Sequence, residues 1–309
     1  MKKKGVYFLI LILILCSFSV LVSINPLFKN QDDTVDRNII PYFSASDSHA
    51  YQWHQIYGGY YDDKGYGVAI DNSNNVYLAG YTSGADYWDM CLVKYDSTGE
   101  KQWDRRWNDE DYGAVHSYGV AVDSSENIYL AGMAYLLAPG HMDMVLVKYN
   151  NSGDQQWNCT WGGSNDDVCN GVAVDSANNV YLAGYTNSFA VGGSDMVLVK
   201  YDSDGVQLWN STWGGSDDDV CNGVTVDLED NVYLAGTTDS FGKGKQDMVL
   251  VKFESNGQYK WNRTWGWIED DMGQGAAIDS SNNVYFAGST NYYESSGTDM
   301  VLVKYNSSG

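Results

Sequence analysis

Four kinds of short apolar run recur in a fixed order along residues 51–309. The first, GVAVD and its variants, alternates apolar positions with small or polar ones and ends at an aspartate. Alternation with a period of two predicts a β-strand with one buried face. These aspartates stand 52 residues apart, at Asp71, Asp123, Asp175, Asp227 and Asp279. A repeat of this length therefore organises most of the chain.

Three further runs follow each strand-ending aspartate. NVYLAG or a close variant comes first, and DMVLVKY or a close variant then opens at Asp89, Asp143, Asp195, Asp247 and Asp299. A fourth run carries two tryptophans four residues apart, as at Trp157 and Trp161. Gly, Asn and Asp, which are typical of turns, separate the runs. Four strands in a unit of this length are typical of a β-propeller blade, and helix should be nearly absent.

The two ends of the repeat region complement each other. The fifth unit carries the first three runs, whereas residues 51–59 have the pattern of the fourth, with Trp53 and Tyr57 in the aromatic places. We therefore predict an all-β, five-bladed propeller of four-stranded blades over 51–309, closed by the N-terminal strand completing the last blade. Closure would leave no open sheet edge. The alternatives are an array that closes only by association and a fragment of a longer protein.

These motifs also resemble a known family. VAVDSANNVYLAGYT, DMVLVKYDSDG and LWNSTWGG are similar to the exported bacterial and archaeal β-propeller repeat family labelled SBBP. The resemblance covers about 260 residues and all four strands in order. It implies a surface or secreted repeat protein without implying a particular activity. The label stands for seven-bladed β-propeller, whereas this chain carries five copies of the repeat.

The N-terminal region differs from the repeats. Three lysines precede an apolar run from Val6 to about Val22, so residues 1–24 read as a secretory signal peptide. An uncut membrane anchor formed by residues 5–24 is the alternative, and polar residues 25–50 read as a linker. We therefore expect an exported protein at the cell surface or outside the cell. Four cysteines lie beyond the signal, and other copies of the repeat lack them, so the fold should not need a disulfide.

The charge balance narrows the choice of partners. The chain has 18 basic and 40 acidic residues and a formal charge of −22. Nucleic acid and an anionic membrane surface would be repelled, so neither is an expected partner. A strong negative charge instead favours solubility or the binding of cations.

Pairs of aspartates recur in the loop before the first strand of four units. Strand directions place these loops on one face, together with the loops between the second and third strands. The residues are Asp62, Asp63, Asp166, Asp167, Asp218, Asp219, Asp270 and Asp271. A ring of carboxylates suits a hard divalent cation, and calcium is the candidate cofactor. Turn caps on a solvated rim are the alternative.

Other repeated residues have structural interpretations. The tryptophans should pack between blades, and the lysine of the third run should form an ion pair with the aspartate that ends the first. Asn158, Asn210 and Asn262 each begin an N-x-T sequon, which makes them candidate glycosylation sites in an exported protein.

Departures from the repeat indicate where a ligand would bind. The second unit has a longer loop carrying Glu110 and His116, and an unusually apolar loop that contains His141. Trp88 and Trp267 lie in loops of the same face and offer aromatic surface for a sugar or a cationic peptide. Ordinary loop anchoring is the alternative for each of these residues.

No catalytic motif is unique within the chain, and five-fold repetition does not provide the distinct acid and base environments that catalysis requires. We therefore expect a non-enzymatic binding module whose partner is an extracellular glycan, peptide or protein. The alternatives are a glycan-active hydrolase or lyase using carboxylates of the central funnel, and a purely structural surface-layer or adhesion module.

Overall fold

The computed structural model describes residues 52–84, 88–108, 112–136, 140–291 and 297–309. All regular elements in these ranges are β-strands, as the sequence predicts. Among the described residues, no helix has the length and hydropathy needed to span a bilayer. The predicted signal or anchor at 1–24 and the linker at 25–50 lie outside the described residues.

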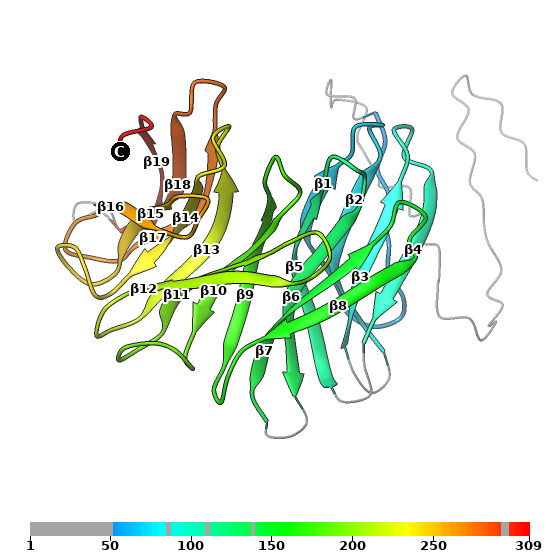
Figure 1. The fold of residues 1–309 in the computed structure, drawn as a ribbon, viewed down its shortest axis with the longest axis horizontal. Helices are drawn as coiled ribbons and strands as arrows, with labels where there is room; N and C mark the ends of the chain where they lie inside the picture. The colour runs from blue at the N-terminus through cyan, green and yellow to red at the C-terminus, as the bar shows by residue number, and fades with distance from the viewer. Residues whose placement is uncertain (1–51, 85–87, 109–111, 137–139, 292–296) are drawn as a thin grey trace, which may run out of the picture. The chain divides into compact units, whose positions relative to one another are not determined.

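The described strands form five antiparallel sheets, and Figure 1 shows the strands of each sheet side by side in chain order. Each of the first four sheets is a four-stranded meander, and the fifth has three described strands. Sheets 1 and 2 consist of β1 (Asp63–Ile70), β2 (Val76–Ser83), β3 (Trp88–Tyr95) and β4 (Lys101–Trp107), and of β5 (Tyr112–Val122), β6 (Ile128–Leu136), β7 (Met142–Tyr149) and β8 (Gln155–Trp161). Sheets 3 and 4 consist of β9 (Asp167–Val174), β10 (Val180–Thr186), β11 (Asp195–Tyr201) and β12 (Gln207–Trp213), and of β13 (Asp219–Val226), β14 (Val232–Thr238), β15 (Asp247–Phe253) and β16 (Tyr259–Trp265). Sheet 5 consists of β17 (Asp271–Ile278), β18 (Val284–Thr290) and β19 (Asp299–Tyr305).

The core lies between successive sheets. One cluster joins Tyr129 and Met144 of sheet 2 to Val180 and Val197 of sheet 3, and equivalent clusters fill the other junctions. The middle strands of sheets 2, 3 and 4 are therefore buried on both faces, which explains why NVYLAG and DMVLVKY read as nearly continuous apolar runs. First strands of neighbouring sheets lie beside each other, so each sheet is packed against the next.

The glycine that ends the NVYLAG run is required by a β-bulge. In sheet 3 the register between β9 and β10 shifts at Gly184, and a β-carbon there would collide with the carbonyl oxygen of Val168. The same collision with a first-strand carbonyl oxygen would occur in every sheet, at Gly80, Gly132, Gly236 and Gly288. The bulge also turns the Asn170 amide towards sheet 4, where it donates to Cys221 O at 2.8 Å.

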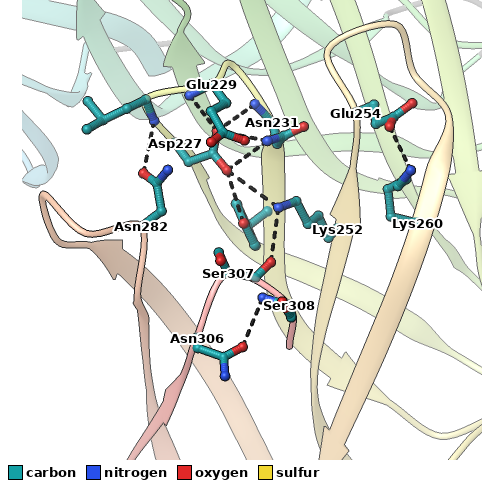
Figure 2. Close-up of polar contacts among 12 residues, drawn as sticks. Asp227, Glu229, Asn231, Lys252, Glu254, Lys260, Asn282, Asn306, Ser307 and Ser308 are labelled. Carbon is teal, nitrogen blue, oxygen red and sulfur yellow. Dashed lines mark hydrogen bonds and ion pairs between the residues drawn. The ribbon is translucent and has the colours of Figure 1, made fainter.

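The aspartate that ends each first strand organises a tight turn, shown for Asp227 in Figure 2. Its carboxylate accepts the backbone N–H groups of Glu229 (2.9 Å) and Asn231 (2.8 Å) and the hydroxyl of Tyr233 (3.1 Å). Asp230, the residue before Asn231, has φ of 62°, and four of the five copies place Asn or Asp at this left-handed position. These aspartates are therefore structural.

The predicted lysine–aspartate ion pair is confirmed in sheets 3, 4 and 5. The Nζ atoms of Lys200, Lys252 and Lys304 lie 3.1, 3.5 and 4.0 Å from the turn aspartates of their own sheets. Lys200 also donates to Ser255 O (3.1 Å) in the turn of sheet 4, and Lys148 donates in the same way to Ser203 O (2.7 Å). The repeated lysine therefore also connects sheet 2 to sheet 3 and sheet 3 to sheet 4.

The first tryptophan of the fourth strand packs across the junction, as predicted. The Trp157 ring faces the α-carbon of Gly205 in the turn of sheet 3, which has φ of +85°. Trp209 lies on Gly257 and Trp261 on Gly309 in the same way. A glycine is needed here because a β-carbon would lie about 3 Å from the indole and because the backbone is left-handed.

The four cysteines of the described region are free thiols. Cys169 and Cys221 are fully buried at the bulge position, where each Sγ lies 3.3 Å from a glycine carbonyl oxygen. This agrees with the expectation that the fold needs no disulfide.

The two ends do not show the predicted closure. Residues 52–59 have no strand structure in the described chain, and they lie against sheet 1. Gln55 Nε2 donates to Gly99 O (2.8 Å), and Tyr57 Oη donates to Asp104 Oδ2 (2.8 Å). Trp53 faces Gly99 just as Trp157 faces Gly205. The segment therefore contacts sheet 1 as the fourth strand of a preceding sheet would, without pairing to β19.

Candidate ligand site on the loop face

Two sets of loops meet at one edge of the sheets, and we call this edge the loop face. It comprises the loops that join each fourth strand to the next first strand and each second strand to the third. Backbone hydrogen bonds connect the two sets, for example from Gly193 N to Ser216 O (3.2 Å) and from Asp219 N to Ser194 O (2.6 Å). The predicted sharing of one face is thus observed at this junction.

A cluster of stacked rings lies at the junction of sheets 1 and 2 on this face. The ring centroids of Tyr81 and His116 are 4.3 Å apart, those of Tyr81 and Trp88 4.7 Å, and those of Trp88 and His116 4.8 Å. Tyr66 and Tyr118 pack beside them. Two of the predicted ligand residues, Trp88 and His116, are therefore in direct contact. Tyr81 is the member that sequence reasoning missed.

His116 has one ring nitrogen in use and one free. Nδ1 lies 3.2 Å from Tyr118 Oη, whereas Nε2 is buried without a hydrogen-bond partner among the described residues. Burial, and to a smaller degree the charge of nearby Lys64, lowers the pKa of His116 below its usual value. The imidazole is therefore neutral at pH 7.

The second histidine lies elsewhere on the loop face. His141 is buried at the junction of sheets 2 and 3, with Nε2 3.3 Å from Asp143 Oδ1. It borders an open polar recess together with Ser164, Asn165 and Asp166. Burial raises the pKa of Asp143, and His141 partly opposes that shift. His116 and His141 therefore belong to separate junctions.

Trp267 is not part of the ring cluster. Trp267 is about half exposed in the loop between sheets 4 and 5, where its backbone N–H donates to Asp271 Oδ2 at 2.6 Å. Glu110 lies outside the described residues. The sequon asparagines stand on the fourth strands; Asn158 and Asn210 are exposed and Asn262 is half-buried.

The aspartate pairs divide into two roles. The second member of each pair opens a first strand, is largely buried, and accepts a loop N–H, as Asp219 Oδ2 does from Gly215 N at 2.8 Å. The first member lies in the loop, where Asp218 Oδ1 accepts Ser194 N (2.8 Å) and Asp166 Oδ1 accepts Met142 N (2.9 Å). No group of three or more His, Cys, Asp or Glu residues in the described chain is arranged to hold a metal ion. Both members of these pairs therefore cap loops, and their role as cation ligands stays a prediction.

Comparison with known proteins supports the repeat architecture. The family model described as SBBP, beta-propeller repeat, matches residues 52–87, 161–189 and 212–242. These stretches are therefore β-propeller repeats, as the motifs suggested. An uncharacterized WD repeat-containing protein of Acanthamoeba polyphaga mimivirus is 27% identical over 118 residues, which are 33% of this chain and 8% of that protein. The chain spans only a small part of that relative.

Several solved structures are similar at low identity. A gluconolactonase from Xanthomonas campestris is 12% identical with a TM-score of 0.44, over 72% of this chain and 69% of that one. A polysaccharide lyase is 10% identical with a TM-score of 0.48, over 83% and 59%. Drosophila Plexin A, solved with Semaphorin 1b, is 9% identical with a TM-score of 0.46, over 78% and 52%. Likenesses this weak provide no argument about activity.

Proposed function

We propose that this chain is an exported, non-enzymatic binding module that holds an extracellular glycan on its loop face, at the ring cluster of Tyr81, Trp88 and His116. The observation that carries the proposal is the stack itself, in which a partly exposed indole adjoins Tyr81 and a neutral histidine. Aromatic faces pack on sugar rings, and a few convergent polar groups fix orientation. A peptide or protein ligand would use the same surface.

The ring cluster is also where the repeat is broken. The β-strand register aligns His116 with Lys64, Val168, Val220 and Met272 of the other sheets. Trp88 directly precedes Asp89, the repeated aspartate of the third run. At the position of Trp88, the other copies have Met142, Ser194, Gln246 and Thr298. Among the five copies, this is the single junction that joins a tryptophan to a histidine. A ligand site that occurs once per molecule is expected where one copy of the repeat differs from the others.

Glycan-array binding tests the proposal. We expect the wild-type chain to bind a defined set of glycans, and Trp88→Ala to weaken that binding by at least about tenfold, the effect of losing an aromatic anchor. Tyr259→Ala is the matched control, because Tyr259 is a half-exposed ring at the start of β16, away from the cluster. Equal binding by both variants would refute the site, and turnover of a bound oligosaccharide would favour the hydrolase or lyase alternative.

The proposal includes export. The lysine-rich and apolar residues 1–24 support it as a signal or anchor. N-terminal sequencing of the secreted chain tests cleavage, and failure to leave the cytoplasm would contradict it.

We further propose that the five sheets close into a ring of five blades. Met300 and Leu302 of β19 are 97% and 66% exposed, whereas the equivalent Met248 and Leu250 of β15 are fully buried. At the other end, Val68 and Ile70 of β1 are 67% and 63% exposed. Both surfaces correspond to those that form the internal junctions, so packing one on the other would bury both.

Sheet 1 has a cavity at the place where the exposed Met300 side chain would pack in a closed ring. At the internal junctions, the Cε atoms of Met196 and Met248 lie against Gly236 and Gly288 of the following sheet. The equivalent glycine of sheet 1, Gly80, lines a cavity of about 50 Å³ together with Gly65 and Tyr57. Met248 stands opposite Trp265 in its sheet, so Met300 would stand opposite Tyr57 if residues 51–57 paired with β19.

Substitution of Met300 by lysine tests closure. In a closed ring the charge would be buried at a junction, and we expect Met300→Lys to lower the free energy of unfolding by about 2–4 kcal/mol. In an open array the residue is solvent-exposed, and the change would be near zero. Urea denaturation measures the difference, with Tyr259→Lys as the exposed control. A loss no larger than that of the control would rule closure out.

A further inference from the structure

Buried carboxylates from two sheets meet at three junctions of the loop face. In each case the aspartate that opens a third strand faces the aspartate that opens the first strand of the next sheet. A β-carbon on the glycine between them would clash with an oxygen of both residues. The pairs are Asp143 with Asp167 around Gly162, Asp195 with Asp219 around Gly214, and Asp247 with Asp271 around Gly266.

The pair at the junction of sheets 3 and 4 is the least compensated. Asp195 and Asp219 are 3% and 0% exposed. Asp195 Oδ2 accepts Val191 N (3.0 Å) and Asp219 Oδ2 accepts Gly215 N (2.8 Å). Oδ1 of each carboxylate is buried without a hydrogen-bond partner among the described residues. Asp195 Oδ1 lies beside Gly214, close to Asp219 Oδ2.

The other junctions show what this position requires. At the junction of sheets 1 and 2, the glycine is replaced by Asn108, whose Nδ2 donates to Asp89 Oδ1 at 2.9 Å. The register places Val115 where the other sheets have the first-strand aspartate, so this position carries no carboxylate there. At the junction of sheets 2 and 3, His141 Nε2 lies 3.3 Å from Asp143 Oδ1. The third-strand aspartate is thus accompanied by an amide donor at the first of these junctions and by a histidine ring nitrogen at the second.

Among the described residues, no donor or cation reaches Asp195 Oδ1. Asp217, Asp218 and Asp239 lie near Asp219 and add negative potential to this end of the junction. Burial, followed by the charge of Asp219, raises the pKa of Asp195 against the bond from Val191. Two buried carboxylates without a counter-charge are costly, so a positive ligand would stabilise this junction strongly.

We propose that the junction of sheets 3 and 4 binds a divalent cation, Ca²⁺, between Asp195 Oδ1 and Asp219 Oδ2, with Asp247 and Asp271 forming a related site at the next junction. Ca²⁺ takes about six to eight oxygen ligands in a flexible arrangement and accepts backbone carbonyl oxygens and water beside carboxylates. Mg²⁺ gives up its water reluctantly and fits a buried pair less well. The ion would tie the loops of two sheets together. This site is independent of the ring cluster proposed above to bind glycan.

Removing one charge without changing the shape tests the proposal. The full chain is stripped with EGTA, and Ca²⁺ binding is measured by equilibrium dialysis and by the rise in Tm on adding Ca²⁺. We expect Asp195→Asn to bind about one ion per chain fewer than wild type and to lose a corresponding part of the rise in Tm. In EGTA its Tm should equal or exceed that of wild type, because the repulsion has been removed. Asp217→Asn, an exposed change in the same loop, should behave as wild type.

Two results would overturn the proposal. One is equal Ca²⁺ stoichiometry in wild type and Asp195→Asn, or no Ca²⁺ binding by wild type at millimolar concentrations. The other is a rise in Tm on adding Ca²⁺ that is the same in wild type and Asp195→Asn, which would place the bound ion elsewhere.

Discussion

Replacing Asp175 with alanine is expected to lower the free energy of unfolding by about 3–5 kcal/mol, because it leaves a buried lysine without its counter-ion. Asp175 accepts the N–H groups of Ala177 (3.0 Å) and Asn179 (2.8 Å) and the hydroxyl of Tyr181 (3.1 Å). Lys200 Nζ lies 3.1 Å away, with its side chain 8% exposed. The ammonium would keep Ser255 O and the Tyr181 ring as its neighbours of suitable polarity.

Asp202→Ala is the matched control for this change. Asp202 caps another turn of the same sheet by accepting Asp204 N (3.0 Å) and Val206 N (2.9 Å), and no buried lysine depends on it. Losing such a cap costs about 1 kcal/mol. Urea denaturation of both variants gives the comparison, and similar losses would show that the buried ion pair contributes little.

The pH dependence of Asp175→Ala gives an independent check. Burial alone would raise the pKa of Asp175, but the bonds from Asn179 and the charge of Lys200 outweigh it and hold the pKa below the ordinary value. A lowered carboxyl pKa stabilises the fold above the ordinary value of about 4, and this contribution is lost as pH falls below it. Wild type should therefore lose stability more steeply than Asp175→Ala on acidification, and parallel curves would contradict the assignment.

The repeat made most of the fold predictable. Strand order, the loop face, the tryptophan contacts and the Lys–Asp ion pairs all follow from a motif with a period of 52, because identical sequences in identical contexts adopt the same structure. The residue-level partners were harder to predict. Adjacent residues such as Asp218 and Asp219 look like a ligand pair in the sequence, but Asp218 caps a loop whereas Asp219 is buried at the start of β13. The buried partner of Asp219 is Asp195, and a constant separation of 24 residues between the two motifs was the available signal.

The ring cluster was predicted only in part, for a related reason. Trp88 and His116 were singled out because each departs from the repeat, yet nothing in their spacing shows that they stack on the same tyrosine. Tyr81 is hidden within an ordinary second strand, where Tyr185 occupies the same place in sheet 3. Its role depends on a contact between two sheets. Such contacts depend on how far the sheets are rotated relative to each other, and one sequence does not reveal that.

Trp157→Ala is expected to cost about 3 kcal/mol and to act mainly on the junction between sheets 2 and 3. The indole lies on Gly205 of sheet 3, and its Nε1 donates to Ser203 O at 3.3 Å. Lys148 Nζ, 5.9 Å from the indole ring, donates to the same carbonyl oxygen and would lose part of its support. Truncation therefore removes buried apolar area and a hydrogen bond at one contact.

Leu208→Ala is the control, because Leu208 is a half-exposed residue of fourth strand β12 and its truncation should cost less than about 1 kcal/mol. Hydrogen exchange measured beside denaturation distinguishes a junction effect from a general one. Amides of β8 and of the turn at residues 202–206 should lose the most protection in Trp157→Ala. Uniform loss across all sheets would mean that the ring contributes to the core in general.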